Sequence, residues 1–270
     1  MSTISLVHPR KTRTVSLTAT VCDLKCAHCG GHYLKGMETP QEVANRGPRH
    51  YTSALISGGM DRSGRLPLED HADFYMLLKS WGWKLNFHGG LLSPGGASFL
   101  DGYADALSFD FITDSATIRE VYGLAIPGST YVSTYRALKK KFHVIPHLTA
   151  GVKAGHLRGE SEALAALAGE EATEVVFLVF IPTRGTRYQD SAPPPLDEVK
   201  RLFARGRDLL PRATFTLGCM HPRGAYGTML ERCALDCGFE RFVMPSQDFR
   251  KSLLADDRYR VVEKEECCVI

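Results

Sequence analysis

Residues 22–29 read CDLKCAHC and place three cysteines in the spacing CxxxCxxC. The run directly follows an apolar, β-branched stretch at residues 14–21, which predicts a strand. The cysteines therefore lie on the loop that leaves the carboxyl end of this strand. One compact loop can direct the thiolates of Cys22, Cys26 and Cys29 at a single point. Three thiolates can hold three irons of a four-iron, four-sulfur cluster and leave the fourth iron open to a ligand.

Two other interpretations of this spacing stay open. A zinc site is the first, because His28 and His32 are close enough to supply a fourth ligand. The second is that the three cysteines are unrelated buried or loop residues. The tight spacing after a strand favours a metal site over this second interpretation.

Composition restricts the class of protein. The chain has 270 residues, 44% of them hydrophobic, which is enough for one sizeable core. A net charge of +3 is too small to indicate nucleic acid, although it suits an acidic protein partner. No apolar run predicts a membrane span, and residues 1–11 do not resemble a signal peptide. Eight cysteines are too few for a disulfide scaffold, so we expect metal-binding thiols in a reducing cytoplasm.

Strand-like runs alternate with helical patterns along the whole sequence. The predicted strands are residues 14–21, 53–57, 84–87, 106–111, 143–148, 174–181, 214–217 and 241–244, and helical patterns cover 69–80, 160–168 and 196–209. This alternation predicts an α/β fold: a (β/α)8 TIM-like barrel, with a partial (β/α)6 barrel as the alternative. The active site of such a barrel lies at the carboxyl ends of the strands, where the cysteine loop is expected.

The carboxyl-terminal residues differ from the rest. We expect residues 1–255 to form the barrel and residues 256–270 to form a charged tail that folds over the barrel mouth. The tail carries the pair Cys267 and Cys268 and ends in Val269 and Ile270. A cysteine four residues from the end permits prenylation, but the residue after Cys267 is not aliphatic, so prenylation is not favoured.

Residues after the second and third predicted strands are candidate ligand contacts. Gly58, Gly59 and Met60 follow the strand at 53–57, and the two glycines let the backbone approach a ligand closely. A plain turn is the alternative. His88 ends the next strand.

The fourth predicted strand carries a carboxylate into the barrel. Alternation places Ser108 and Asp110 on the same face. A buried carboxylate is costly unless it binds a polar group, so Asp110 either contacts ribose hydroxyls or has a structural partner.

Cys219 follows the strand at 214–217 and is expected at the barrel mouth. Arg223 and His221 lie nearby in sequence, so we expect an electropositive, reactive thiol, with Arg223 as a catalytic residue. Cys233 and Cys237 are four residues apart on the following helix, which predicts a structural, core-facing role.

Three thiols then remain, those of Cys219, Cys267 and Cys268. A tail over the barrel mouth would bring the last two to the first, and together they would hold a second cluster. A disordered tail is the alternative.

The cysteine loop resembles the signature of the radical S-adenosylmethionine (SAM) superfamily. There an aromatic residue commonly occupies the position of His28 and a glutamate that of Met60. The resemblance implies that SAM chelates the open iron and is cleaved to methionine and a 5′-deoxyadenosyl radical. It further implies that the backbone of residues 58–60 pairs with the methionine part of SAM. The turn at Pro182 and Thr183 resembles one that biotin-synthase-like members place near adenine.

Several further segments resemble one biotin-synthase-like group, the two-protein lipoyl synthases, and within it the member that acts first on the octanoyl chain. They are SGGMDRSGRLPL at 57–68, TIREVYGL at 117–124, IPTRGT at 181–186, GCMHPRG at 218–224 and ECC at 266–268. The resemblance implies SAM and two 4Fe-4S clusters, the second being the sulfur donor. It implies thiolation at C8 of an octanoyl-lysine, followed by a sister enzyme at C6.

The partners implied by this resemblance are an octanoylated carrier protein (H protein, E2 domain or lipoate-binding protein), the sister radical SAM subunit and a low-potential donor such as ferredoxin. Neither nucleic acid nor a membrane is expected. The alternatives are another biotin-synthase-like radical SAM enzyme, such as a biotin synthase or a mutase, and a non-enzymatic iron-sulfur protein.

Overall fold

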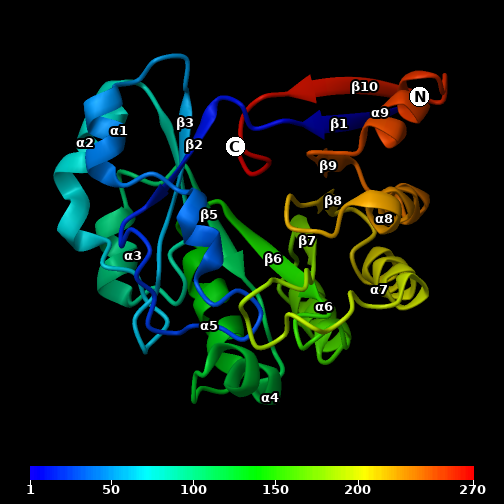
Figure 1. Cartoon of the computed structure of the whole chain (residues 1–270), viewed down its shortest axis with the longest axis horizontal. Helices are drawn as coiled ribbons and strands as arrows, with labels where there is room; N and C mark the ends of the chain where they lie inside the picture. The colour runs from blue at the N-terminus through cyan, green and yellow to red at the C-terminus, as the bar shows by residue number, and fades with distance from the viewer.

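The computed structural model describes residues 1–270 and contains one sheet of ten parallel strands (Figure 1). The strands are β1 (Ser2–Val7), β2 (Thr12–Ser16), β3 (Ser53–Ser57), β4 (Lys84–Phe87), β5 (Ala106–Asp110), β6 (Val144–Ala150), β7 (Glu174–Val179), β8 (Thr214–Leu217), β9 (Arg241–Val243) and β10 (Tyr259–Lys264). Their order in the sheet is β10-β1-β9-β8-β7-β6-β5-β4-β3-β2.

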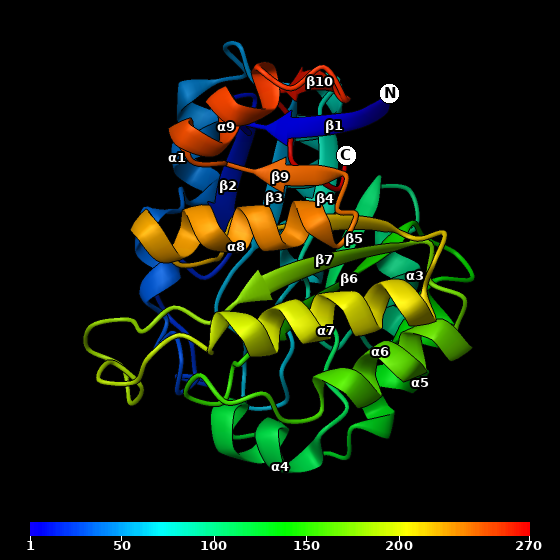
Figure 2. The same ribbon diagram turned by 90° about the vertical axis from the view of Figure 1, so that its right-hand side faces the viewer.

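Helices connect the strands and cover the outside of the sheet. They are α1 (Pro40–Arg46), α2 (Ala72–Ser80), α3 (Pro94–Leu100), α4 (Ser115–Thr117), α5 (Ser129–Leu138), α6 (Glu160–Gly169), α7 (Leu196–Leu209), α8 (Gly224–Asp236) and α9 (Gln247–Leu254), with short turns η1 (His32–Gly36), η2 (Glu69–His71) and η3 (Ile118–Tyr122). Figure 2 shows α7 lying between α6 and α8, with β7 behind this layer. None of the helices has the length and hydrophobicity that a membrane-spanning helix needs.

The predicted TIM-like α/β class is confirmed, but the sheet is a curled half-barrel rather than a closed ring of eight strands. Its edge strands, β2 and β10, do not pair with each other. The prediction omitted β1 and β10, which pair along their full length with Ser2 opposite Tyr259. The strand predicted at residues 14–21 runs too far toward the cysteine loop, because β2 ends at Ser16 and turns follow.

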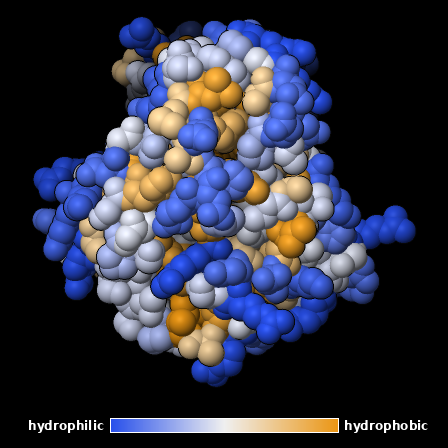
Figure 3. Space-filling model, turned by 90° about the vertical axis from the view of Figure 1, so that its left-hand side faces the viewer, coloured by the Kyte–Doolittle hydropathy of each residue, from blue (hydrophilic) through white to orange (hydrophobic).

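The core lies between the sheet and the helices. Four aromatic rings, those of Phe177 on β7, Phe203 on α7, Phe215 on β8 and Phe239 in the loop before β9, pack with centroids 4.6 to 5.3 Å apart. All four side chains are fully buried, and each contributes about 1.5–3 kcal/mol through burial. On the outer face of α1 and α2, hydrophobic atoms form only small separate patches (Figure 3). The core between the sheet and the helices therefore supplies most of the hydrophobic stabilisation. The inner face of the sheet can carry polar residues as a result.

The tail does not fold over the mouth of the barrel, so that prediction is wrong. Residues 259–264 form β10, and the residues after it turn into the barrel, where Figure 1 shows the C-terminus inside the ring of strands. The side chain of Val269 packs on Ala106, Ile145 and Val176, in the amino-terminal halves of β5, β6 and β7. The tail therefore closes the barrel interior from below.

The stagger of the strands explains this placement. The carboxyl end of β10 lies beside the amino end of β2, because Lys11 N donates to Glu265 O and Cys267 N donates to Thr12 Oγ1. A chain leaving β10 therefore reaches the floor of the barrel rather than its mouth. Sequence periodicity does not report this stagger, because the stagger depends on which strands pair.

Candidate active site

The barrel encloses a cavity of about 470 Å³, a size typical of small-molecule sites. Loops at the carboxyl ends of the strands form its upper part, and the tail forms its floor. Most of the lining is hydrophobic, with Leu24, Leu55, Leu178, Phe180 and Met220 among the contributing side chains. The polar lining residues are concentrated on β4, β5 and β6.

Cys22, Cys26 and Cys29, named here the loop cysteines, all line the upper part of this cavity. Their loop is compact because Cys29 N and Gly30 N both donate to Cys26 O. Lys25 adopts a left-handed conformation, with φ of 44°, which turns the chain between the first two cysteines. The structure therefore brings together the three cysteines that the spacing predicts as ligands.

Gly59 admits the cysteine loop to the end of β3. A Cβ atom at this position would lie 1.8 Å from Val21 O and 2.6 Å from Cys22 Cα, which no side chain can occupy. Gly59 N donates to Thr18 Oγ1, and Asp23 N donates to Met60 O. Gly59 thus lets the cysteine loop pack against the end of β3. Gly58 and Met60 line the cavity, and Gly59 does not.

The loop cysteines include a closely coupled thiol pair. A hydrogen bond with the Cys26 thiol lowers the pKa of Cys29 to about 4, and the same bond raises the pKa of Cys26. All eight cysteines of the chain are free thiols.

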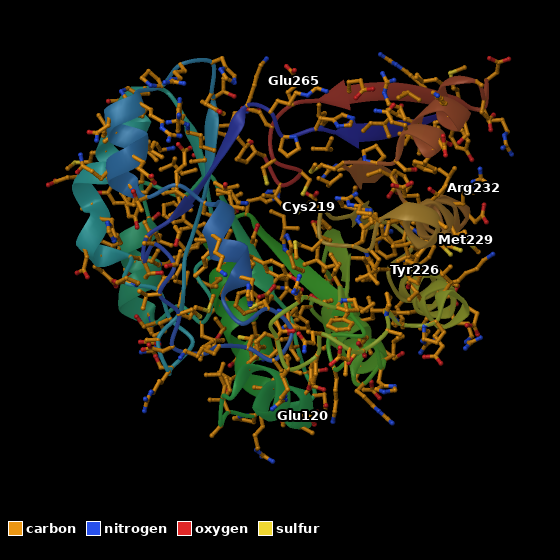
Figure 4. The ribbon with its side chains drawn as sticks, in the orientation of Figure 1. Glu120, Cys219, Tyr226, Met229, Arg232 and Glu265 are labelled. Atoms are coloured by element: carbon orange, nitrogen blue, oxygen red, sulfur yellow. The ribbon has the colours of Figure 1, made fainter.

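Cys219, Cys267 and Cys268, named here the floor cysteines, line the same cavity, Cys267 and Cys268 from the tail below it and Cys219 from the loop after β8. A hydrogen bond with Cys268 lowers the pKa of Cys267 to about 7 and raises that of Cys268. The charge of Cys267 also raises the pKa of Cys219, so the three thiols are within electrostatic range of one another. Figure 4 places Cys219 beside the C-terminal segment, inside the ring of strands. The tail thiols therefore approach Cys219 from the floor side of the cavity, and a shared cluster remains a prediction.

The Cys219 thiol lines the cavity near a positive charge, but it is less activated than the sequence suggested. Burial raises its pKa more than the charge of Arg223 lowers it. His221 is almost fully buried and bonds to Gly218 O. Arg223 does not line the cavity.

The guanidinium of Arg223 instead holds the Cys219 loop. It donates to Cys219 O at 2.9 Å and to Met244 O at 2.7 Å, and its Nη1 lies 3.0 Å from His221 Nε2. These contacts position the loop, and a catalytic role for Arg223 remains a prediction.

Cys233 and Cys237 lie outside the cavity, on α8. Both are half-buried, whereas Leu230 and Ala234 form the fully buried stripe of this helix. The two thiols flank that stripe instead of lying within it, and they do not face either cysteine group.

A cluster of ionisable groups crosses the middle of the cavity. His88 Nε2 lies 3.3 Å from Asp110 Oδ1, and the His88 and His147 rings stack with centroids 5.7 Å apart. Burial alone would raise the pKa of Asp110, but His88, His147 and His28 together outweigh it and lower the value to about 2. The sequence predicted either a ribose contact or a structural partner for Asp110, and His88 is such a partner.

Two buried nitrogens in this region lack a hydrogen-bond partner, His28 Nδ1 and His88 Nε2. The contact between His88 and Asp110 has the distance of an ion pair without the alignment of a hydrogen bond. Both histidines line the cavity. The two nitrogens themselves are buried, and His88 Nε2 faces Asp110, so a cofactor role of His88 remains a prediction.

Pro182 and Thr183 lie next to the loop that follows the cysteines. The Thr183 and Tyr33 hydroxyls are 3.1 Å apart, and the Thr183 hydroxyl also donates to Ile181 O. Ile181 and Tyr33 line the cavity, whereas Pro182 and Thr183 do not. Any contact of these two residues with a cofactor remains a prediction.

Neither cysteine group forms a site for a single metal ion. No three His, Cys, Asp or Glu side chains converge closely enough to hold one ion. In a cubane cluster each thiolate binds a different iron, so its ligands stand further apart. Each cysteine group supplies three free thiols on one side of the cavity.

Sequence reasoning missed the residues that surround the floor cysteines. Asn86 and Ser108 are buried polar residues, and Asn86 Nδ2 lies 3.6 Å from Cys267 Sγ. Alternation along β4 does place Asn86 on the same face as His88, so a signal existed. Its contact with the tail could not be inferred, since the tail was expected elsewhere.

Comparisons with known proteins identify the fold. No protein-family model matches the chain, and no curated protein matches it. Among solved structures, methylornithine synthase (PylB) superposes with a TM-score of 0.62 at 14% identity, covering 91% of this chain and 74% of PylB. The FeFe-hydrogenase maturase HydG from Carboxydothermus hydrogenoformans superposes with a TM-score of 0.65 at 14% identity, covering 89% of this chain and 58% of HydG.

SuiB from Streptococcus suis gives a TM-score of 0.53 at 13% identity, covering 83% of this chain and 50% of SuiB. The chain thus spans only about half the length of HydG and SuiB. All three are radical SAM enzymes. The protein therefore has the half-barrel fold found in radical SAM enzymes.

The contact at Gly59 leads to a first prediction. Gly59→Ala should lower the free energy of unfolding by about 1–3 kcal/mol, because the new methyl group overlaps the backbone of the cysteine loop. Gly36→Ala is the control, since a Cβ there has no neighbour within 4 Å, and it should change stability by less than about 0.5 kcal/mol. Urea unfolding of both metal-free variants measures this, and equal effects would contradict the steric argument.

The His147 environment leads to a second prediction. Burial and the charge of His88 lower the pKa of His147 from 6.5 to about 4. Between these values the unfolded chain binds the proton and the folded protein does not, so this residue reduces stability as the pH falls from 6.5 to 4. His147→Asn should make the pH dependence shallower by up to about 1.4 kcal/mol per pH unit. Urea unfolding across this range, with exposed His156→Asn as control, tests it, and identical slopes would refute the assignment.

Proposed function

We propose that the protein is a radical SAM enzyme that inserts sulfur at C8 of an octanoyl-lysine in lipoyl cofactor biosynthesis. The loop cysteines would bind the cluster that carries SAM. The floor cysteines would bind a second four-iron, four-sulfur cluster that donates the sulfur. The observation that supports this most directly is that two groups of three free cysteines line one cavity from opposite sides.

The loop cysteines support the first part of the proposal. They lie at the carboxyl end of β2, on the half-barrel that radical SAM enzymes share, and face a cavity large enough for a nucleoside ligand. When bound, SAM and its cluster supply a radical that can remove hydrogen from an unactivated carbon. The side chains of His28 and His88 line the same cavity and would lie beside the cofactor.

The net reaction replaces one C–H bond of the octanoyl chain by one C–S bond. The hydrogen atom would leave C8 with the 5′-deoxyadenosyl group, and the second cluster would supply the sulfur and accept the one remaining electron. One SAM and one electron from a low-potential donor are consumed, and methionine is released. The overall change balances because both electrons of the C–H bond are accounted for.

The residues of the barrel would bind and orient the acyl chain. Leu55, Val176 and Leu178 line the cavity between the two cysteine groups and would pack on its methylene groups. A chain that enters at the mouth would pass the loop cysteines and reach the floor cysteines with its terminal carbon. The buried tail closes the other end and would keep bulk water from the reacting carbon.

The proposed reaction implies partners and a location. The substrate would be an octanoylated carrier protein (an H protein, an E2 domain or a lipoate-binding protein). A sister radical SAM subunit would add the second sulfur at C6, and a donor such as ferredoxin would supply electrons. Reduced thiols in all eight cysteines suit the cytoplasm.

The loop cysteines lead to a third prediction. Replacing Cys22, Cys26 and Cys29 together by Ala should abolish reductive cleavage of SAM, because the first cluster loses every protein ligand. The fold should survive, since the three side chains project from a loop. Formation of 5′-deoxyadenosine with dithionite as reductant, together with circular dichroism, measures both. Undiminished 5′-deoxyadenosine would exclude a radical SAM function.

The floor cysteines lead to a fourth prediction. Removing residues 267–270 should leave SAM cleavage measurable but stop thiolation of an octanoyl-lysine peptide, and iron per chain should fall from about eight to about four. Iron assay and product mass spectrometry measure these changes.

Replacing Cys233 and Cys237 together by Ala is the matched control, because these thiols face neither side of the cavity. This variant should keep its full iron content. A truncated protein that retains both its iron and sulfur insertion would refute the second cluster. About four irons per wild-type chain would instead favour a radical SAM enzyme without a sacrificial cluster.

A further inference from the structure

Polar contacts hold the tail at the residue that precedes the floor cysteines. Glu266 accepts hydrogen bonds from Thr52 Oγ1 at 2.7 Å and from Lys84 Nζ at 2.8 Å. The Glu266 side chain is only 25% exposed, so this ion pair is partly shielded from solvent. Because each carboxylate oxygen has its own donor, the carboxylate is fixed in orientation as well as in position.

The backbone of Cys267 is fixed by a second contact. Cys267 N donates to Thr12 Oγ1 at 2.7 Å, and Thr12 Oγ1 lies 2.7 Å from Ser53 Oγ. Ser53 Oγ donates in turn to Lys11 O, so the Thr12 hydroxyl is the donor to Ser53. This chain of hydrogen bonds starts at the tail and ends on the backbone between β1 and β2.

The sulfur of Cys267 is fixed by a third contact, from Asn86. The Ser108 backbone N–H can only donate, and it points at Asn86 Oδ1 at 3.1 Å. The amide nitrogen must therefore face the other way, where it lies 2.9 Å from Ser108 Oγ and 3.6 Å from Cys267 Sγ. Asn86 is fully buried, and an amide buried in this way is costly unless its hydrogen bonds are made.

We propose that Thr12, Thr52, Lys84 and Asn86 form a dock that holds residues 266–267 and directs the Cys267 sulfur into the cavity. The four are positioning residues, and the consequence for a second cluster rests on the proposed function. Packing of Val269 alone would bury the tail without fixing the direction of the sulfur. The dock supplies that direction through partners on β2, β4 and the segment before β3.

The dock makes a prediction for the metal-free protein that needs no cluster. Lys84→Met and Asn86→Leu should each speed alkylation of Cys267 by iodoacetamide about 5- to 30-fold, because a charge-assisted or buried hydrogen bond no longer opposes release of the tail. Mass spectrometry of the Cys267 peptide at successive times gives the rate. Lys84→Arg should restore the wild-type rate, because it keeps the donor to Glu266.

Lys79→Met is the matched control. Lys79 forms an ion pair of similar length, 2.6 Å, with Asp105 and does not touch the tail. In the Lys79→Met variant, Cys267 should be alkylated at the wild-type rate. Unchanged rates in both Lys84→Met and Asn86→Leu would overturn the dock.

A second measurement separates the dock from the proposed function. In the background that lacks the loop cysteines, any remaining cluster belongs to the floor cysteines, so its spectrum can be followed alone. Asn86→Leu should lower the reduction potential of that cluster, because a hydrogen bond to a ligand sulfur is lost. Electron paramagnetic resonance during a redox titration reports it, and an unchanged potential would overturn the contact to sulfur. No iron in that background would contradict the second cluster, while the alkylation rates would still decide the dock.

Discussion

The pairing of β1 with both β9 and β10 is the interaction on which the arrangement of this protein depends. It places the first strand of the chain near the end of the sheet and leaves β2 as an edge. The seam between β2 and β10 stays open, so the chain after β10 can turn inward there. Had β2 paired with β1, ladder hydrogen bonds would occupy the backbone of Lys11, which instead binds Glu265. The tail would then have no route into the barrel.

The polar interior follows from the same architecture. Helices bury the outer face of the sheet, so the fold draws its hydrophobic stabilisation from that face and can place Asn86, Ser108, Asp110 and His147 on the inner one. These groups satisfy each other in part, through the Asn86–Ser108 bonds and the His88–Asp110 pair. A buried network of this kind adds little to stability and is expensive to leave unpaired. Its position between two groups of cysteines indicates that it serves the cavity.

Local sequence patterns predicted much of this structure. The strands Ser53–Ser57, Lys84–Phe87 and Thr214–Leu217 and the helix Leu196–Leu209 have the predicted bounds, because apolar periodicity and turn residues define them locally. The loop cysteines line one cavity together, since a short loop leaves little freedom.

The errors concern contacts between distant segments. Strands β1 and β10 pair with each other across 257 residues of sequence, with Ser2 opposite Tyr259, which local patterns do not report. The tail was placed at the mouth because stagger cannot be read from periodicity. Arg223 looked like a neighbour of the Cys219 thiol in sequence, yet its guanidinium binds the carbonyls of Cys219 and Met244, since the loop turns the side chain away from the cavity.

The order of the two cysteine groups along the cavity bears on the shape of the substrate. The strands are parallel, so the loops at their carboxyl ends all meet at the mouth, and any ligand entering there meets the loop cysteines first. The floor cysteines Cys267 and Cys268 escape this rule only because the tail reaches the barrel from the opposite end. A compact ligand at the mouth would contact one group alone. A linear, flexible, apolar chain can extend past the first group and bring its terminal atom to the second, which is the shape of an acyl chain attached to a lysine.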